Sequence, residues 1–448
     1  MHRKLSPAET LYVSASRSRA VLTCQVHGDV DEKLLGAAVD AKVAQHPSLR
    51  SRVGLVEGAP ALLPLPGEPP ALIVRPLGPG AFAEEMNTPL SADGPLFRAV
   101  LLRGSGEHTF VLSVDHTVTD GHSALALHDA LWRTYAELAD GAGVPDARQE
   151  NWPEAATDLL PHCSEQRIAE HLARRLDESK RGPIAFLPYE AAIAGPSTGP
   201  GGEGPGGDGL GGDGLGGDGT GQRVQVQRVL LESDATARLV RYSRAVGLSV
   251  HGLVSGALLA ALRRRLGGIP GPLALGCLSP VDLRGRVTPP IGREVMIPAV
   301  TGFLDILQVP ADADPLALGR EVVAHLRTAI ERGDFVPETH ILPEVIGNPA
   351  LLATSLIVTN LGSVPGPPAP TGLRLTGMRL IPVREQYYPQ AGRGPLMACV
   401  TSFDGRLAIE LPYSTECFGH EQIGGIRADV EAALLSFADR DGDTATVE

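Results

Sequence analysis

Residues 115–123 read DHTVTDGHS and place a histidine, an aspartate and a glycine directly after an apolar run. The pattern His-x-x-x-Asp is present at His116–Asp120 and again at His27–Asp31, whereas chance predicts about 0.7 copies in such a chain. Only the first copy is followed by glycine, Gly121, and requiring this glycine lowers the chance expectation to about 0.1 copies. The stretch is therefore a moderately specific signal that needs support from the rest of the chain.

This stretch joins a predicted strand to a predicted helix. In residues 109–116, alternation along the strand places His116 on the more apolar face and Asp115 on the opposite face. Apolar side chains recur at helical spacing over residues 122–139, and Asp120 is placed to cap the start of that helix. The pattern predicts a strand, a histidine, a tight turn containing Gly121, and a helix.

A histidine held at the end of a strand suits general base catalysis. Imidazole has an ordinary pKa of about 6.5, so it can accept and return a proton near neutral pH. The residues alone also allow a simpler interpretation, in which His116 is a buried, hydrogen-bonded histidine, Asp120 is only a helix cap and Gly121 serves only the turn.

Composition excludes several classes of protein. The chain has 448 residues, of which 43% are hydrophobic, enough for two globular domains. A formal net charge of −13 argues against nucleic acid as a partner. Five scattered cysteines without a Cys-x-x-Cys pair indicate neither disulfides nor a thiolate metal site, and they favour a reducing cytoplasm. Because the chain shows neither an apolar signal segment nor a long apolar run, we expect a soluble protein without a membrane span.

A Gly-rich tract divides the chain. Residues 195–221 repeat GGDG every five residues, and such a polar tract cannot bury enough surface to offset the entropy of ordering it. We expect a flexible tether between an N-terminal domain, residues 1–194, and a C-terminal domain, residues 222–448. The alternative is a calcium-binding repeat, but those repeats have a period of about nine residues and a regular apolar position.

Both predicted domains mix helices and strands. Asp404-Gly405 lies between two apolar arms and predicts a type I′ hairpin. Periodicity predicts strands at 21–27, 223–231, 273–279, 354–359 and 397–411 and helices at 31–46, 234–246, 250–266 and 315–332.

Further short segments support the 115–123 stretch. They are LSPAE (5–9), HPSLRSR (46–52), PVDLRGR (280–286), TNLG (359–362) and FDGRLAIELPYS (403–414). In this order, together with HxxxDG, they resemble the condensation-domain and chloramphenicol acetyltransferase-like superfamily of acyltransferases. The resemblance is strongest to free-standing polyketide-associated members of the phthiocerol/phthiodiolone dimycocerosyl transferase type. It spans nearly the whole chain except the Gly-rich tract and the acidic tail.

The resemblance implies an α/β fold of two related chloramphenicol acetyltransferase-like sandwich domains, which form a V around a central channel. It implies that His116 is the catalytic base and that Asp120 is structural and pairs with Arg284 of PVDLRGR. A buried carboxylate needs such a partner to offset its desolvation, and arginine can supply two hydrogen bonds. For Arg284 the alternative is an ordinary solvated arginine.

The resemblance also implies the substrates. The acyl donor is a thioester of an acyl carrier protein or of coenzyme A, so phosphopantetheine is a co-substrate and no cofactor is tightly bound. The acceptor is an alcohol-bearing small molecule, and we expect a monomer. The alternative is a carrier-protein docking module or a condensation-like enzyme adapted to another reaction; the intact HxxxDG motif argues against a silent scaffold.

Two motifs depart from the superfamily pattern. Asp115 stands where the longer HHxxxDG form has its first histidine, which weakens an assignment to amide formation. TNLG replaces the DFGWG signature of plant relatives, so Asn360 is only a candidate oxyanion or channel residue, and its alternative role is that of a turn former.

Several charged or ligating side chains have competing interpretations. His122 and His128 could bind a metal but are expected to be helix-surface histidines, so no metal site is predicted. The runs Arg174-Arg175 and Arg263-Arg264-Arg265 are candidate docking patches for an acidic carrier protein, with a solvated helix face as the alternative.

Overall fold

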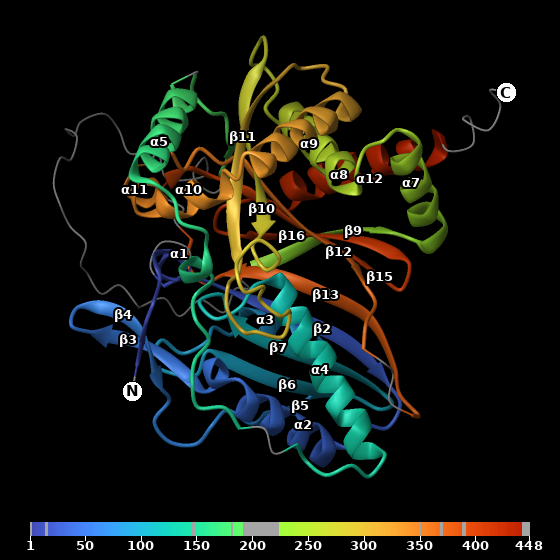
Figure 1. Ribbon diagram of the computed structural model, residues 1–448. Coiled ribbons are helices and arrows are strands. Elements are labelled where there is room, and N and C mark those ends of the chain that lie inside the picture. The colour runs from blue at the N-terminus through green and yellow to red at the C-terminus, as the bar shows by residue number, and fades with distance from the viewer. Residues whose placement is uncertain are drawn as a thin grey trace, which may run out of the picture.

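The computed structural model describes residues 2–13, 17–145, 148–180, 182–190, 224–348, 351–367, 371–387 and 391–440. Two large sheets lie one above the other in Figure 1, each covered by helices on its outer face. The Gly-rich tract 195–221 lies outside the described residues, so its role as a tether stays a prediction.

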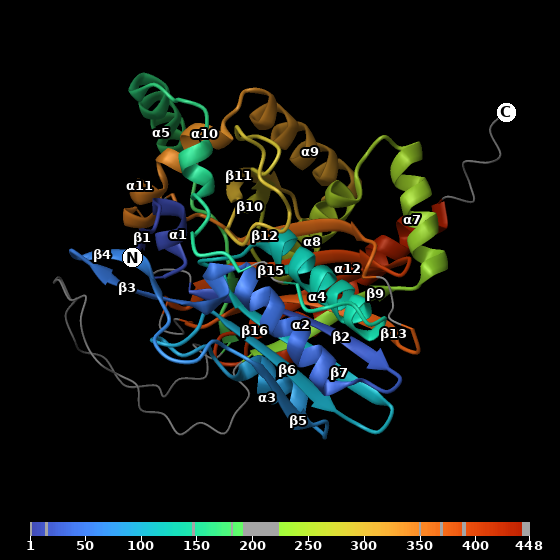
Figure 2. The ribbon, with the colours of Figure 1, turned by 60° about the horizontal axis from the view of Figure 1, so that its bottom comes forward.

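The first large sheet is built mainly from the N-terminal half. Its strand order is β13-β2-β7-β6-β5, antiparallel except for the β5–β6 pair. Helices α2 and α4 cover one face (Figure 2), where the apolar side chains of the sheet and both helices form a continuous core. The strands are β2 (Ser18–His27), β5 (Leu72–Pro76), β6 (Phe97–Arg103), β7 (Glu107–Asp115) and β13 (Arg374–Arg384), and the helices are α2 (Glu32–Gln45), α3 (Ala81–Asn87) and α4 (Gly121–Ala139).

The second large sheet has the order β11-β10-β12-β15-β16-β9. Its helices lie above it in Figure 1 and bury the outer face of the sheet in a second core. The strands are β9 (Val224–Leu231), β10 (Leu273–Asp282), β11 (Val300–Val309), β12 (Leu356–Val364), β15 (Leu396–Phe403) and β16 (Arg406–Ser414), and the helices are α7 (Ser233–Ala245), α8 (Val250–Arg265), α9 (Pro315–Glu331) and α12 (His420–Asp439).

Smaller elements complete the molecule. A sheet in the order β1-β4-β3 flanks the first core, and α5 packs its apolar side chains against α10 and α11 of the other half. These elements are β1 (Arg3–Lys4), β3 (Ser51–Val56), β4 (Ala59–Pro64), β8 (Leu187–Pro188), β14 (Arg393–Gly394), α1 (Pro7–Leu11), α5 (Glu165–Ser179), α10 (Phe335–His340), α11 (Leu342–Gly347) and the short 3-10 turns Pro47–Arg50 and Ala156–Leu159.

The predicted helices and strands are confirmed to within a few residues at their ends. The hairpin at Asp404-Gly405 is also confirmed: these residues have φ values of 51° and 72°, the left-handed conformation that a type I′ turn requires. All five cysteines are buried, and none forms a disulfide.

One strand does not follow a division of the chain into two domains at the Gly-rich tract. Although β13 belongs to the C-terminal half of the sequence, it pairs antiparallel with β2 along nearly its whole length and forms the edge of the first sheet. The two halves of the chain are therefore joined by this shared strand and by its contacts with β15 and β16 of the second sheet.

Within the described ranges, no single helix is long and apolar enough to cross a bilayer; only α7 and α8 taken together would qualify, and they are bent by 101°.

Candidate active site

The loop that carries His116 is fixed at both ends. At the end of β7, the His116 N–H donates to the Ser18 carbonyl at 2.8 Å. At the start of α4, Asp120 is the N-cap, as predicted: its Oδ1 accepts from the Ser123 N–H at 2.8 Å, and the Ser123 hydroxyl accepts from the Asp120 N–H at 3.0 Å. This reciprocal capping box satisfies two backbone donors that would otherwise be unpaired.

The imidazole of His116 is largely enclosed by the protein. Burial lowers the pKa of His116 below its ordinary value, and nearby backbone groups and the Asp120 and Asp115 carboxylates offset this only in part. Its Nδ1 atom is enclosed and makes no hydrogen bond of normal geometry to the described residues, while the residue as a whole is partly exposed. His116 is therefore neutral at neutral pH, the state that a general base requires.

Tyr12 stacks on this imidazole and was missed by the sequence analysis. The two ring centroids are 4.0 Å apart and the ring planes are inclined by 8°. Burial, and to a smaller extent the Asp120 carboxylate, raises the pKa of Tyr12, so the phenol is neutral. The LSPAE segment was a partial signal for this residue, because Tyr12 ends the helix that LSPAE begins.

The LSPAE segment itself is a helix start. Ser6 caps α1 by accepting from the Glu9 N–H, and the Glu9 carboxylate accepts from the Ser6 N–H. Arg3 then donates to both oxygens of Glu9, at 2.7 and 3.0 Å. These contacts hold the short helix rigidly and thereby position Tyr12.

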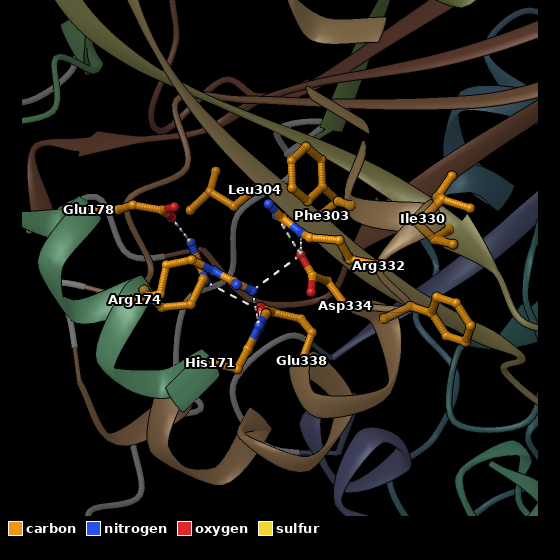
Figure 3. Close-up of a pocket in the computed structure, with 14 residues that line it drawn as sticks. His171, Arg174, Glu178, Phe303, Leu304, Ile330, Arg332, Asp334 and Glu338 are labelled. Carbon is orange, nitrogen blue, oxygen red and sulfur yellow. Dashed lines mark hydrogen bonds and ion pairs between the residues drawn. The ribbon is translucent and has the colours of Figure 1, made fainter. Parts of the chain in front are cut away.

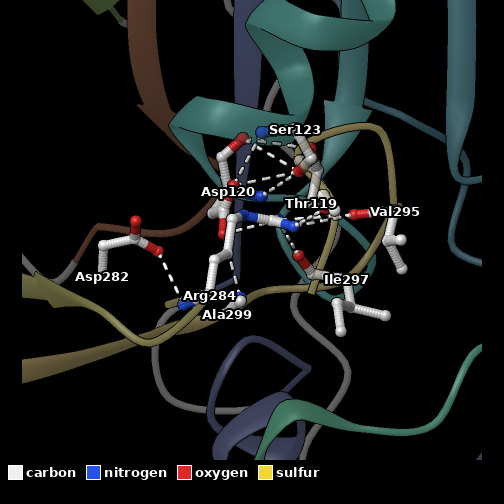
Figure 4. A network of polar contacts seen from close by, with 9 residues as sticks. Thr119, Asp120, Ser123, Asp282, Arg284, Val295, Ile297 and Ala299 are labelled. Carbon is white, nitrogen blue, oxygen red and sulfur yellow. Dashed lines mark hydrogen bonds and ion pairs between the residues drawn. The ribbon is translucent and has the colours of Figure 1, made fainter. Parts of the chain in front are cut away.

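The ion pair expected between Asp120 and Arg284 is present (Figure 4). Arg284 Nη2 lies 2.9 Å from Asp120 Oδ2, and both side chains are at most 6% exposed. The Ala299 N–H donates to the same oxygen at 2.9 Å. Burial acts to raise the pKa of Asp120, but Arg284 and the Ser123 and Ala299 N–H groups outweigh it, so the net shift is downward and the carboxylate is ionised.

Arg284 is not a solvated surface arginine. Besides Asp120, its guanidinium donates to three backbone carbonyls in the segment that follows β10: Gly292 at 2.7 Å, Ile297 at 3.1 Å and Val295 at 3.3 Å. One side chain therefore ties the start of α4 in the first half to a loop of the second half. The His116–Asp120 loop is thus held by contacts from both halves.

Gly121 is needed for a reason different from the predicted one. Its φ is not in the left-handed region, so the turn itself does not require glycine. Instead, a Cβ at this position would lie 2.6 Å from Leu361 Cδ2, a distance that real contacts do not reach. The TNLG segment therefore packs directly on the HxxxDG loop, a tertiary contact that the sequence did not reveal.

Asn360, the candidate oxyanion residue, shapes a turn. Its Oδ1 accepts from the Gly362 N–H at 2.9 Å, and Gly362 has a φ of 69°. The β12–β15 register shifts between Asn360 and Ser363, so this turn forms a bulge beside the active-site loop. In this geometry the Asn360 side chain stabilises the turn.

Asp115 is adjacent to His116 in the chain, but its side chain contacts Thr117 and Arg17 instead, as strand alternation predicted. Its Oδ1 accepts from the Thr117 N–H at 2.9 Å, and its Oδ2 lies 3.9 Å from Arg17 Nε. Burial raises the pKa of Asp115.

The prediction that His122 and His128 lie on the helix surface is wrong for His128. His128 is 1% exposed, and its Nε2 lies 3.1 Å from Trp132 Nε1, which donates to it, and 3.2 Å from Cys24 Sγ. The helical periodicity of α4 places His128 on the face that packs against the core. Among the described residues, no group of three or more His, Cys, Asp or Glu side chains could hold a metal ion.

The two arginine runs do not form free basic patches. Arg263 is buried and donates to carbonyls at the end of α8 and beyond, while Arg264 and Arg265 pair with Asp429. Both interpretations offered by the sequence, a docking patch and a solvated face, are therefore wrong for Arg263.

The other run lies in a polar network between α5 and α10 (Figure 3). Arg174 lies 3.1 Å from Asp334, and the buried Arg175 lies 3.3 Å from Glu338. His171 also lies 2.6 Å from Glu338. Here too the arginines have specific carboxylate partners, and Arg175 is not on a solvated face.

Comparison with known proteins agrees with this architecture. Residues 220–412 match the family model described as the C-terminus of phthiocerol/phthiodiolone dimycocerosyl transferase. The protein of that name from Mycobacterium ulcerans is 25% identical over 365 residues, 81% of each chain.

Two solved structures share the fold. Polyketide synthase associated protein 5 from Mycobacterium tuberculosis has a TM-score of 0.72 at 20% identity, covering 96% of this chain and 98% of the other. Trichothecene 15-O-acetyltransferase from Fusarium sporotrichioides has a TM-score of 0.72 at 11% identity, covering 97% and 95%.

Fold and similarity together define the class. The chain has the fold of the condensation-domain and chloramphenicol acetyltransferase-like proteins and is an acyltransferase. In sequence it is similar to the phthiocerol/phthiodiolone dimycocerosyl transferases, the relationship that its motifs predicted.

Proposed function

We propose that this acyltransferase moves an acyl group from a thioester to a hydroxyl group of a polyketide or related natural product, with His116 as the general base. The observation that carries the proposal is the state of His116: a neutral imidazole, stacked on Tyr12, on a loop held by the Asp120–Arg284 ion pair. A rigidly held base with a pKa shifted by its surroundings is typical of catalytic sites.

The proposed reaction is a direct transfer. His116 removes the proton from the acceptor hydroxyl, and the oxygen attacks the thioester carbonyl to form a tetrahedral oxyanion. The C–S bond then breaks, the thiolate leaves, and the imidazolium returns its proton to the sulfur, so an ester and a free thiol are formed. The sequence of steps needs no acyl-enzyme and no metal ion.

Direct transfer requires that donor and acceptor are bound together. We propose that both enter a channel between the two halves of the molecule, because holding them in line supplies much of the rate enhancement. The donor is an acyl carrier protein or acyl-CoA, so no cofactor is tightly bound. We further propose that the protein acts as a monomer and that it is located in the cytoplasm. The unpaired, buried cysteines support a reducing compartment.

The surrounding residues have positioning roles in this proposal. Asp120 and Arg284 hold the loop in place, and Gly121 allows Leu361 to pack against it. The tetrahedral oxyanion needs preorganised N–H donors. The Asn360 side chain remains a candidate through its amide group, since only its oxygen is engaged in the turn.

The test is thiol release from acyl thioesters in the presence of an alcohol acceptor. We expect His116→Ala to lower the rate by about 100- to 10,000-fold, the usual contribution of a general base, with unchanged thermal unfolding. His162→Ala, at an exposed histidine, is the matched control and should be fully active. Tight binding of a carrier protein without acceptor-dependent thiol release would instead support a docking module.

A further inference from the structure

The two faces of the second sheet differ beside the active-site loop. On its outer face, under the helices of Figure 1, the alternate side chains of β12 are fully buried: Leu356 and Val358. Successive side chains of a strand point to opposite faces, so Ile357, Thr359 and Leu361 lie on the inner face. Leu361 lies against Gly121. The inner face of β12 therefore begins directly beside the loop that carries His116.

Strand register extends this inner face to the neighbouring strands. Ile357 pairs with Leu278 of β10 and with Met397 of β15. Leu278 in turn pairs with Leu304 of β11. Paired residues of adjacent strands share a face of the sheet. Together they form the inner apolar row, defined as Leu304, Leu278, Ile357 and Met397.

The inner apolar row is not packed into either large core. Leu278, Ile357 and Met397 are partly exposed, and within the described part of the chain no member of the row belongs to the two large cores. Cys399, two residues beyond Met397 on the same face, is by contrast fully buried in the first core. The inner face is therefore packed at Cys399 and accessible at the row. Adjacent exposed apolar side chains are typical of a binding surface.

Polarity changes along this face with distance from the loop. Thr359 lies between Leu361 and Ile357 and carries a hydroxyl group close to the loop, whereas the next row is entirely apolar. An acyl thioester has the same profile, because its carbonyl and sulfur lie at the reacting end and only methylene groups follow. A polyketide alcohol bears oxygen atoms along its chain, so it matches an apolar row less well.

The spacing along β12 corresponds to a definite chain length. From Leu361 to Ile357 the strand advances by roughly 13 Å. An extended alkyl chain advances about 1.3 Å per carbon atom, as follows from its bond lengths and angles. An acyl chain that starts at the level of Leu361 therefore reaches the inner apolar row with roughly ten carbon atoms.

We propose that the inner apolar row binds the acyl chain of the donor and selects its length, with Ile357 and Met397 as specificity-determining residues. This inference rests on the proposed function and narrows its substrates to thioesters whose apolar chains are long enough to reach the row. The chain runs from the His116 loop along the inner face of β12, and its far end contacts the row.

The test measures kcat/KM for acetyl, hexanoyl and decanoyl thioesters of one thiol, with one alcohol acceptor. In the wild-type protein kcat/KM should rise with chain length, because each buried methylene group contributes up to about fourfold. Ile357→Trp places an indole in the path of the chain and should lower the ratio of the decanoyl to the acetyl value by about tenfold or more.

Two controls accompany this variant. Ile357→Leu conserves the side-chain volume and should keep the ratio. Ile73→Trp, at a 38% exposed site on β5, introduces the same indole away from the row and should also keep it. Met397→Trp repeats the block from the neighbouring strand, and thermal unfolding establishes that each variant is folded. Tryptophan is well tolerated in strands.

Each outcome separates this inference from the proposed function. If the wild-type protein releases thiol from none of the three donors, the proposed function fails first. If it uses all three donors and the two tryptophan variants of the row leave the ratio unchanged, the row does not bind the acyl chain. A ratio that changes instead with the chain length of the alcohol, measured with ethanol and decanol, would assign the row to the acceptor and overturn the inference.

Discussion

Tyr12 lies flat against the imidazole of His116, with ring centroids 4.0 Å apart, although the two residues are far apart in sequence. One face of the imidazole is therefore covered by an aromatic ring, and in the proposed mechanism the acceptor hydroxyl approaches from the ring edge or the other face. The same contact keeps water from the covered face, which contributes to the burial that lowers the pKa of His116.

The first prediction distinguishes the contribution of the Tyr12 ring from that of its hydroxyl group. Tyr12→Phe keeps the stack and should retain nearly full kcat, whereas Tyr12→Leu removes an aromatic contact worth about 0.5–1.5 kcal/mol and should lower kcat about tenfold. Because Tyr12→Leu also admits water, the acidic limb of its pH–rate profile should move up toward pH 6.5. A loss of stability with no movement of that limb would make Tyr12 purely structural.

The second prediction concerns pH dependence in the wild-type protein. In the proposed mechanism the active form of His116 is neutral, and burial shifts its pKa below 6.5. The value of kcat/KM should therefore rise with pH to a plateau, and the midpoint of the rise should lie below 6.5. An inflection above pH 7 in initial-rate measurements would contradict His116 as the base.

The third prediction tests the Asp120–Arg284 ion pair by a double-mutant cycle. Asp120→Ala and Arg284→Ala should each lower the free energy of unfolding by about 3–5 kcal/mol, because each leaves a buried charge without its partner. The double variant should lose clearly less than the sum of the two. Urea unfolding of the wild-type protein, the two single variants and the double variant gives the four free energies of unfolding.

The surface pair Arg133–Asp129 provides the control for that cycle. It has a similar distance, 2.7 Å, but it lies within one helix and its side chains are 54% and 30% exposed. Arg133→Ala should cost no more than about 0.5 kcal/mol. Additive losses at Asp120 and Arg284 would show that the two charges are not energetically coupled.

The fourth prediction concerns the contact between Gly121 and Leu361. Gly121→Ala places a Cβ 2.6 Å from Leu361 Cδ2, and overpacking of this kind costs about 1–3 kcal/mol. Adding Leu361→Ala to Gly121→Ala should recover part of the lost stability and activity. If Leu361→Ala gives no recovery, the glycine is required for another reason.

The fifth prediction concerns acid stability. Burial lowers the pKa of His128 to about 3, so between pH 6.5 and about 3 the unfolded chain binds a proton that the folded protein does not. Stability from this group is complete above pH 6.5 and falls by up to about 1.4 kcal/mol per pH unit on acidification. His128→Gln should reduce that slope in urea unfolding measured from pH 6 to 4. An unchanged slope would mean that His128 is protonated in the folded protein.

Much of this architecture was predictable because it depends on interactions between residues that are close in sequence. Asp120 caps α4 and Asp404-Gly405 turns its hairpin because capping and positive φ depend on residues close in sequence. The Asp120–Arg284 pair followed from a motif resemblance supported by the energetic need of a buried carboxylate for a partner.

The sequence by itself determined the alternation of helix and strand, the His116–Asp120 loop and the family that the chain resembles. Tertiary structure alone decided that β13 crosses to the first sheet, that Tyr12 covers His116 and that His128 is buried. The physical reason is range: propensity, capping and periodicity act over a few residues, whereas these contacts form only when two distant apolar faces pack and exclude water.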